Sequence, residues 1–83
     1  MALHEGVTQM TILVKVYATL RTYTGGEGTL YMDEAETVKD ILDKLGVPAK
    51  DVKNVIVNGR KRSIDYLLAD GDRVALFPPI AGG

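Results

Sequence analysis

Hydrophobic and polar positions alternate with a period of two in two stretches near opposite ends of the chain. Within residues 11–17, one side of an extended chain carries Ile12, Val14 and Val16, and the other carries Leu13, Lys15 and Tyr17. Within residues 73–77, the two sides carry Val74 with Leu76, and Arg73 with Ala75 and Phe77. This alternation predicts two β-strands, each with one face in the core and one nearer solvent.

A helical period replaces the alternation between residues 37 and 45. One apolar stripe is formed by Val38, Ile41, Leu42 and Leu45, a spacing typical of a helix that packs one face against the core. Thr37 is a good N-cap residue, and Asp40 three positions later completes a capping-box pattern. Gly46 and Pro48 end the helix. The acidic residues Asp33, Glu34 and Glu36 precede it, where the helix dipole favours negative charge without any metal ion.

Shorter strands are expected between these elements. Residues 29–32 follow the glycine-rich turn at 25–28, which we interpret as a hairpin turn rather than a phosphate-binding loop. Residues 55–57 form a strand that leads into Asn58-Gly59, a strong hairpin signal. A basic return strand follows it, Arg60-Lys61-Arg62, which either meets an acidic partner or only blocks pairing at a sheet edge.

For residues 63–68 we predict a crossing turn or a short 3₁₀ segment, with three side chains available for the core: Ile64, Leu67 and Leu68. The order strand, strand, helix, strand, short strand, strand gives an α+β domain with a mixed sheet of four to five strands. The first and last strands can then lie side by side and parallel. One helix covers only one sheet face. The opposite face would present Leu13, Tyr17, Ala75 and Phe77 together, an apolar patch that indicates a docking surface.

Composition limits the possible functions. The chain has 83 residues, no cysteine and a formal net charge of −1, so it is a single domain without disulfides, thiolate metal sites or general attraction to nucleic acid. No stretch is apolar for long enough to span a membrane, and His4 and Glu5 lie where a signal peptide would be apolar. We therefore expect a cytoplasmic protein with residues 1–9 as a poorly ordered extension and residues 10–77 as the domain. His4, the single histidine, leaves no familiar catalytic set, so we expect no enzyme and no bound metal or cofactor.

The last residues, Phe77-Pro78-Pro79-Ile80-Ala81-Gly82-Gly83, favour an extended arm. Proline cannot donate to a sheet ladder, so the last strand should end at about Phe77. Residues 78–83 would then form a flexible tail with a thin diglycine tip. Such a tip is either a frayed terminus or a carboxylate that passes down a narrow channel into the active site of another protein.

Five stretches in this order and spacing resemble the MoaD/ThiS sulfur-carrier family, a branch of the ubiquitin-like β-grasp proteins, over residues 10–83. The stretches are residues 14–21, 37–42, 57–59, 70–72 and 77–83. The final Phe-Pro-Pro-Ile-Ala-Gly-Gly is most similar to the ending of the MoaD branch, the small subunits of molybdopterin synthase. The resemblance implies a β-grasp fold with a protruding C-terminal tail.

The resemblance also implies a reaction and its partners. The carboxylate of Gly83, next to Gly82, would be adenylated with Mg-ATP by an E1-like enzyme of the MoeB/ThiF type. It would then become a thiocarboxylate that delivers sulfur inside the large, MoaE-type subunit of molybdopterin synthase. The residues expected to contact these partners are Tyr17, Phe77, Pro78, Pro79, Ile80 and Ala81. At the position after the hairpin turn, where the family often has an apolar residue, this chain has Arg60, Lys61 and Arg62.

Other functions fit the same residues. A ubiquitin-like modifier would join the activated Gly83 to a lysine, and a carrier for thiamine or for tRNA thiolation would need the same tail. An inert interaction module, whose tail is incidental, is the alternative from a different class.

Overall fold

A computed structural model of the chain describes residues 11–33 and 35–79. Its strands are β1 (Ile12–Val16), β2 (Thr29–Met32), β3 (Asn54–Val57), β4 (Arg60–Arg62) and β5 (Arg73–Phe77). The helices are the α-helix α1 (Val38–Leu45) and two 3₁₀ helices, η1 (Ala18–Thr24) and η2 (Ala49–Asp51). The expectations for residues 1–9 and for Ile80, Ala81, Gly82 and Gly83 lie outside the described residues.

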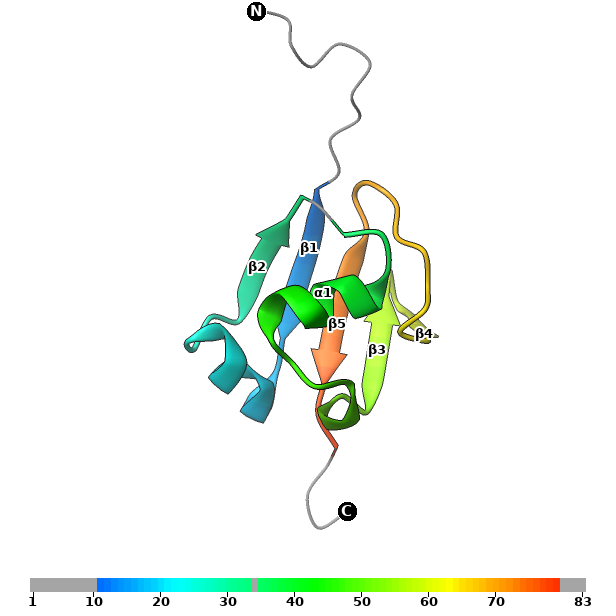
Figure 1. Cartoon of the computed structure of the whole chain (residues 1–83). Helices are drawn as coiled ribbons and strands as arrows, with labels where there is room; N and C mark the ends of the chain where they lie inside the picture. Colours follow the sequence, from blue (N-terminus) through cyan, green and yellow to red (C-terminus); the bar gives the residue numbers. More distant parts are fainter. Residues whose placement is uncertain (1–10, 34, 80–83) are drawn as a thin grey trace, which may run out of the picture.

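The five strands form one mixed sheet in the order β2-β1-β5-β3-β4, and α1 lies across one face of it (Figure 1). The first and last strands are parallel neighbours, with Val14 opposite Val74, while the other strand pairs are antiparallel. This is the β-grasp arrangement, so the predicted α+β class and the parallel pairing are confirmed. The last strand ends at Phe77, as the prolines predicted.

Side-chain alternation along the strands places the core between the sheet and α1. The inward strand positions are Ile12, Val14, Val16, Val55, Val57, Val74 and Leu76, all buried. From the helix, Val38, Ile41 and Leu42 are buried against them, and Leu20 of η1 is buried as well. The predicted faces of the two long strands and the predicted helix stripe are therefore confirmed.

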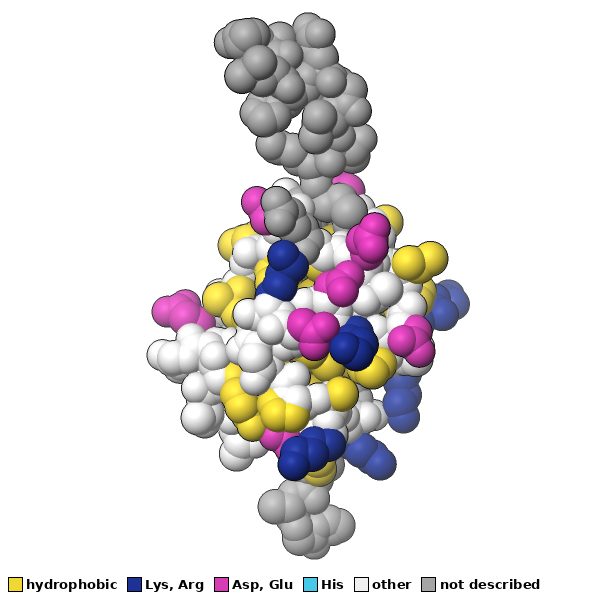
Figure 2. Space-filling view, in the orientation of Figure 1, with side chains coloured by type: hydrophobic (Ala, Val, Ile, Leu, Met, Phe, Trp, Pro, Cys, Tyr) yellow, Lys and Arg dark blue, Asp and Glu magenta, His cyan; other side chains and the backbone are white. Residues whose placement is uncertain are grey.

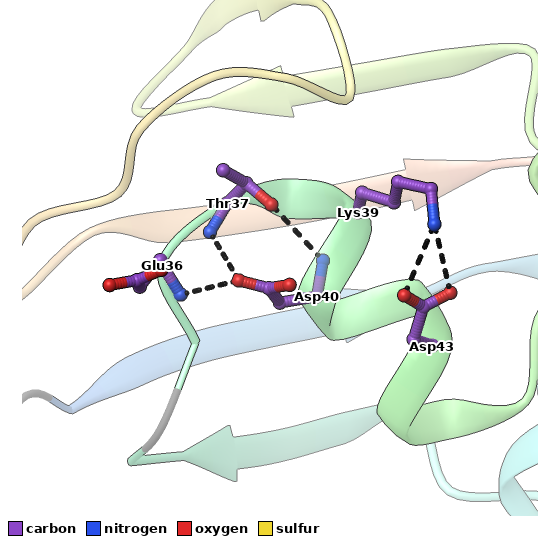
Figure 3. A network of polar contacts seen from close by, with 5 residues as sticks. All are labelled: Glu36, Thr37, Lys39, Asp40 and Asp43. Carbon is purple, nitrogen blue, oxygen red and sulfur yellow. Dashed lines mark hydrogen bonds and ion pairs between the residues drawn. The ribbon is translucent and has the colours of Figure 1, made fainter.

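The N-terminus of α1 is fixed by a complete capping box (Figure 3). The Thr37 hydroxyl accepts a hydrogen bond from the Asp40 backbone N–H, and one carboxylate oxygen of Asp40 accepts from the N–H groups of Thr37 and Glu36. These backbone donors lower the pKa of Asp40 below its usual value, with Thr37 as the largest cause and Glu36 as the next. An exposed ion pair, Lys39 with Asp43 at 3.2 Å, lies one turn further along.

The hairpin between β3 and β4 forms at the predicted dipeptide. Asn58 and Gly59 both have positive φ, 52° and 85°, as a type I′ turn requires. The Asn58 side chain also joins this turn to the loop before β5: its amide donates to Asp72 at 2.8 Å, and its carbonyl oxygen accepts from the Arg73 N–H at 3.0 Å. The turn is thus held to the central strand by side-chain contacts as well as by the ladder.

The prediction for residues 63–68 was wrong in one side chain. Leu67, expected in the core, is 73% exposed, whereas Ile64 and Leu68 are half-buried and pack against the core. After a turn at residues 64–65 the chain is extended, and Leu67 pairs with Thr37 in an isolated β-bridge. In an extended backbone, successive side chains point to opposite sides. Tyr66 and Leu68 therefore face the core, and Leu67 between them faces solvent.

Candidate functional site

The sheet face opposite α1 carries the residues that the sequence grouped as a docking surface. Leu13, Tyr17, Ala75 and Phe77 are each half-buried on this outer face, and the register brings their strands together as neighbours. Their predicted juxtaposition is confirmed. Their role in partner binding stays a prediction.

The two aromatic residues at the end of this face lie against each other. The rings of Tyr17 and Phe77 are stacked, with centroids 4.6 Å apart and an angle of 4° between their planes. Hydrogen bonds hold the backbone beneath them: Tyr17 N–H donates to the Leu76 carbonyl at 3.2 Å, and Lys53 N–H donates to the Phe77 carbonyl at 2.8 Å. The last residue before the prolines is therefore fixed from both neighbouring strands.

Two shallow hollows flank the start of the C-terminal segment, and both include Pro78 and Pro79. One continues from the outer face and is lined by Tyr17, Ala18, Thr19, Asn54, Phe77 and the two prolines. The other is lined by Thr19, Leu20, Thr22, Tyr23, Asp51 and the same prolines. Pro78 is half-buried and Pro79 is exposed. The two prolines therefore contribute to both hollows at the end of the described chain.

The second hollow was missed from the sequence. It depends on η1 and η2, which no periodic pattern announced, and on a hydrogen bond of 2.6 Å from the Tyr23 hydroxyl to the Asp51 carboxylate. This hydrogen bond is the main reason why the pKa of Tyr23 is raised. Tyr23 and Asp51 lie 28 positions apart in the sequence, so neither residue carried a local signal.

The described residues contain no group of three or more His, Asp or Glu side chains that could hold a metal ion. Among the helices described for this chain, none is long and apolar enough to cross a membrane. What residues 11–33 and 35–79 offer is an outer sheet face with apolar residues, next to the diproline at Pro78 and Pro79. The predicted reactive residues Gly82 and Gly83, and the predicted contacts Ile80 and Ala81, follow outside them.

A comparison with protein-family models gives a match to the ThiS family over residues 14–83. The chain belongs to the ThiS family. The match begins within β1 and continues through Gly82 and Gly83, so it includes all of the sheet except Ile12 and Leu13, and the residues beyond the diproline. The resemblance to the MoaD/ThiS family that the sequence motifs indicated is therefore confirmed. Membership places the chain among the sulfur carriers and small ubiquitin-like modifiers.

Proteins similar to this chain are named both as protein modifiers and as molybdopterin converting factors. The chain is 33% identical over 92 residues to small archaeal modifier protein 3 of Haloferax volcanii, covering 89% of this chain and 100% of that protein. A solved structure from Pyrococcus furiosus, named as a molybdopterin converting factor subunit 1, is 28% identical with a TM-score of 0.68, covering 86% of this chain and 99% of the other.

A third similar structure contains a second protein. It is the complex of BexX with CysO from Amycolatopsis orientalis, with 26% identity, a TM-score of 0.63 and coverage of 87% of this chain and 99% of the matched one. A protein similar to this chain thus occurs in a complex with a second protein, which supports a partner protein for this chain too.

Proposed function

We propose that this chain is a sulfur carrier whose Gly83 carboxylate is activated and converted to a thiocarboxylate. The observation that carries the proposal is the family match through Gly83, the residue whose carboxylate would react. The described body supports it, because the last strand ends at Phe77 and the diproline that follows lines two hollows at this end of the sheet.

The chemistry needs two steps in a partner enzyme. The carboxylate oxygen attacks the α-phosphorus of Mg-ATP and pyrophosphate leaves, which gives an acyl adenylate. Hydrosulfide then attacks the activated carbonyl, AMP leaves with the electrons of the broken C–O bond, and loss of the S–H proton gives the thiocarboxylate. A free carboxylate is a poor electrophile, and adenylation supplies the leaving group that it lacks. An E1-like enzyme of the MoeB/ThiF type would supply this catalysis, and the carrier itself would supply only the reacting carboxylate.

We further propose that the sulfur goes to molybdopterin, with this chain as the small subunit of molybdopterin synthase and a MoaE-type protein as the large one. The Phe-Pro-Pro-Ile-Ala-Gly-Gly ending and the similarity to the Pyrococcus furiosus protein support this destination. In such a complex the stacked pair of Tyr17 and Phe77 would lie against the large subunit while the tail enters its active site.

The test is ATP–pyrophosphate exchange with the E1-like enzyme of the same host. The assay compares four proteins: the wild type, Gly82→Ala, a Gly83 deletion and the surface control Leu67→Ala. Their melting temperatures are first shown to be equal. We expect the deletion to abolish exchange and Gly82→Ala to reduce it ~100-fold or more, because a small displacement of the reacting carbonyl has a large effect. Leu67→Ala should match the wild type. A Gly83 deletion that supports exchange at the wild-type rate would rule out the carrier function.

A second candidate is a protein modifier, favoured by the similarity to small archaeal modifier protein 3. The same adenylate would be attacked by a lysine amine and form an isopeptide bond with loss of AMP. No lysine or arginine follows Arg73, so trypsin would leave residues 74–83 attached to each modified lysine. Mass spectrometry of host proteins for this branched peptide separates the candidates: its presence supports conjugation, and a thiocarboxylate without it supports carriage alone.

A further inference from the structure

The outer sheet face has a charge pattern that the helix-covered side does not share. Its outward strand positions carry three cations, Lys15 of β1, Lys61 of β4 and Arg73 of β5, and no Asp or Glu occupies an outward position on any of the five strands. On the helix-covered side, Asp and Glu side chains are spread among the lysines (Figure 2). A chain of net charge −1 has therefore gathered positive charge on one face.

The three cations surround an apolar floor. Lys15, Ala75, Ile56 and Lys61 lie opposite one another across β1, β5, β3 and β4, so the lysine backbones are three strand spacings apart, or about 14 Å. Arg73 is two residues before Ala75 on the same face and lies opposite Leu13. A shallow hollow opens here, and its lining includes Leu13, Lys15, Ile56, Arg73 and Ala75.

None of these charged groups has a partner in the described part of the chain. The ion pair found there joins Lys39 with Asp43, and the side chains of Lys15, Lys61 and Arg73 make no hydrogen bond with any described residue. Unpaired cations around an apolar floor are complementary to an apolar side chain flanked by carboxylates.

We propose that this hollow, which we call the basic hollow (Leu13, Lys15, Ile56, Arg73 and Ala75, with Lys61 opposite Ile56 on β4), binds an acidic segment of the partner protein that activates Gly83. The segment would place an apolar side chain on Ala75 and Ile56 and carboxylates at the rim. The proposal rests on the proposed function, because the hollow shares its face with Tyr17 and Phe77 at the start of the tail.

The other possible occupants fit less well. A second copy of the chain would have to offer its own acids, but several of them are already engaged: Asp40 caps α1, Asp43 pairs with Lys39, and Asp51 accepts from Tyr23. A nucleic acid would gain only three phosphate contacts from a face with an apolar centre, on a chain of net charge −1, which gives weak and strongly salt-dependent binding.

The experiment measures the Kd of the full chain for the E1-like enzyme of the same host by titration calorimetry at 50 and 300 mM NaCl. Lys15→Glu and Arg73→Glu are each expected to weaken binding about 10-fold or more at low salt and to flatten its salt dependence, because their charges act on the rate and strength of docking. The matched control is Lys39→Glu, the same charge change on α1, which should alter Kd less than about twofold. Should a reversal impair folding, Lys15→Gln and Arg73→Gln replace it, with several-fold weakening expected.

The outcomes separate this inference from the proposed function. Binding of Lys15→Glu and Arg73→Glu at wild-type strength would overturn the basic hollow, even where the Gly83 deletion abolishes exchange and so upholds the carrier function. Salt-sensitive binding of host tRNA that these reversals remove, with enzyme binding unchanged, would assign the hollow to nucleic acid instead. Self-association in sedimentation that the reversals remove, again with enzyme binding unchanged, would assign it to a second copy.

Discussion

Leu76 and Phe77 are neighbours on β5 that face opposite sides of the same sheet. Leu76 is completely buried under α1, whereas Phe77 is half-buried on the outer face and stacks on Tyr17. On β1, β3 and β5 the inner face is uniformly aliphatic, and the outer face mixes apolar side chains with cations. If the outer face binds the partner as proposed, one set of strands serves folding on one side and recognition on the other, and substitutions on the two sides should have separable effects.

The largest effect is expected from Leu76→Ala. Removing a fully buried leucine side chain from the centre of the sheet loses its transfer free energy and leaves a cavity, about 3 kcal/mol in the free energy of unfolding. In a domain of this size the melting temperature should fall by more than ~10 °C. Thermal unfolding followed by circular dichroism measures this. A loss below ~1 kcal/mol would mean that the inner face is not the main core.

Phe77→Ala should affect partner binding more than the stability of the fold. Loss of the stacked ring at the outer face should weaken binding of the large partner by about 2 kcal/mol, ~30-fold in Kd, as for an interface hot spot. Its melting temperature should fall clearly less than that of Leu76→Ala, because the ring is only half-buried. The control is Leu67→Ala, an exposed apolar residue outside this face. An unfolded Phe77→Ala would show that the outer face is part of the core.

Thr37→Ala tests the helix that covers the inner face. Its hydroxyl caps α1 by accepting from the Asp40 N–H, and loss of such a cap destabilises a protein by about 1 kcal/mol. The expected decrease in melting temperature is ~4–8 °C. Partner binding at a temperature where the variant is fully folded should equal that of the wild type, because α1 lies on the inner side. Weaker binding by the folded variant would contradict the assignment of recognition to the outer face.

The smallest effect concerns the pH dependence of the same cap. The backbone N–H groups of Thr37 and Glu36 lower the pKa of Asp40 in the folded state. The carboxylate therefore stabilises the fold above its unfolded pKa, near 4, and this contribution is lost as the pH falls through the lower folded pKa. Asp40→Asn should be less stable than the wild type in urea at pH 7, with the difference shrinking toward pH 2. A difference that stays constant over this range would exclude a role for the ionised group.

Sequence patterns predicted the faces because alternation is a local property. The strand at residues 12–16 and the stripe from Val38 to Leu45 each repeat a period over several residues. The turn at Asn58-Gly59 depends only on the backbone conformations of these two residues. Leu67 was misplaced because its direction is set by a bridge to Thr37, far away in the chain. The hollow beside Tyr23 depends on its contact with Asp51, which no local pattern encodes.

The position of β5 in the sheet also has a kinetic consequence. β5 is the last strand in the sequence, yet it is the central strand, between β1 and β3. Its pairing with β1 joins opposite ends of the domain, the kind of non-local contact that slows folding. During synthesis the sheet cannot close until residues 73–77 have left the ribosome, and a chain truncated before Arg73 lacks the strand that holds its two halves together. Premature fragments should therefore remain unfolded and be degraded, and the chains that fold are those in which residues 73–77 have emerged from the ribosome.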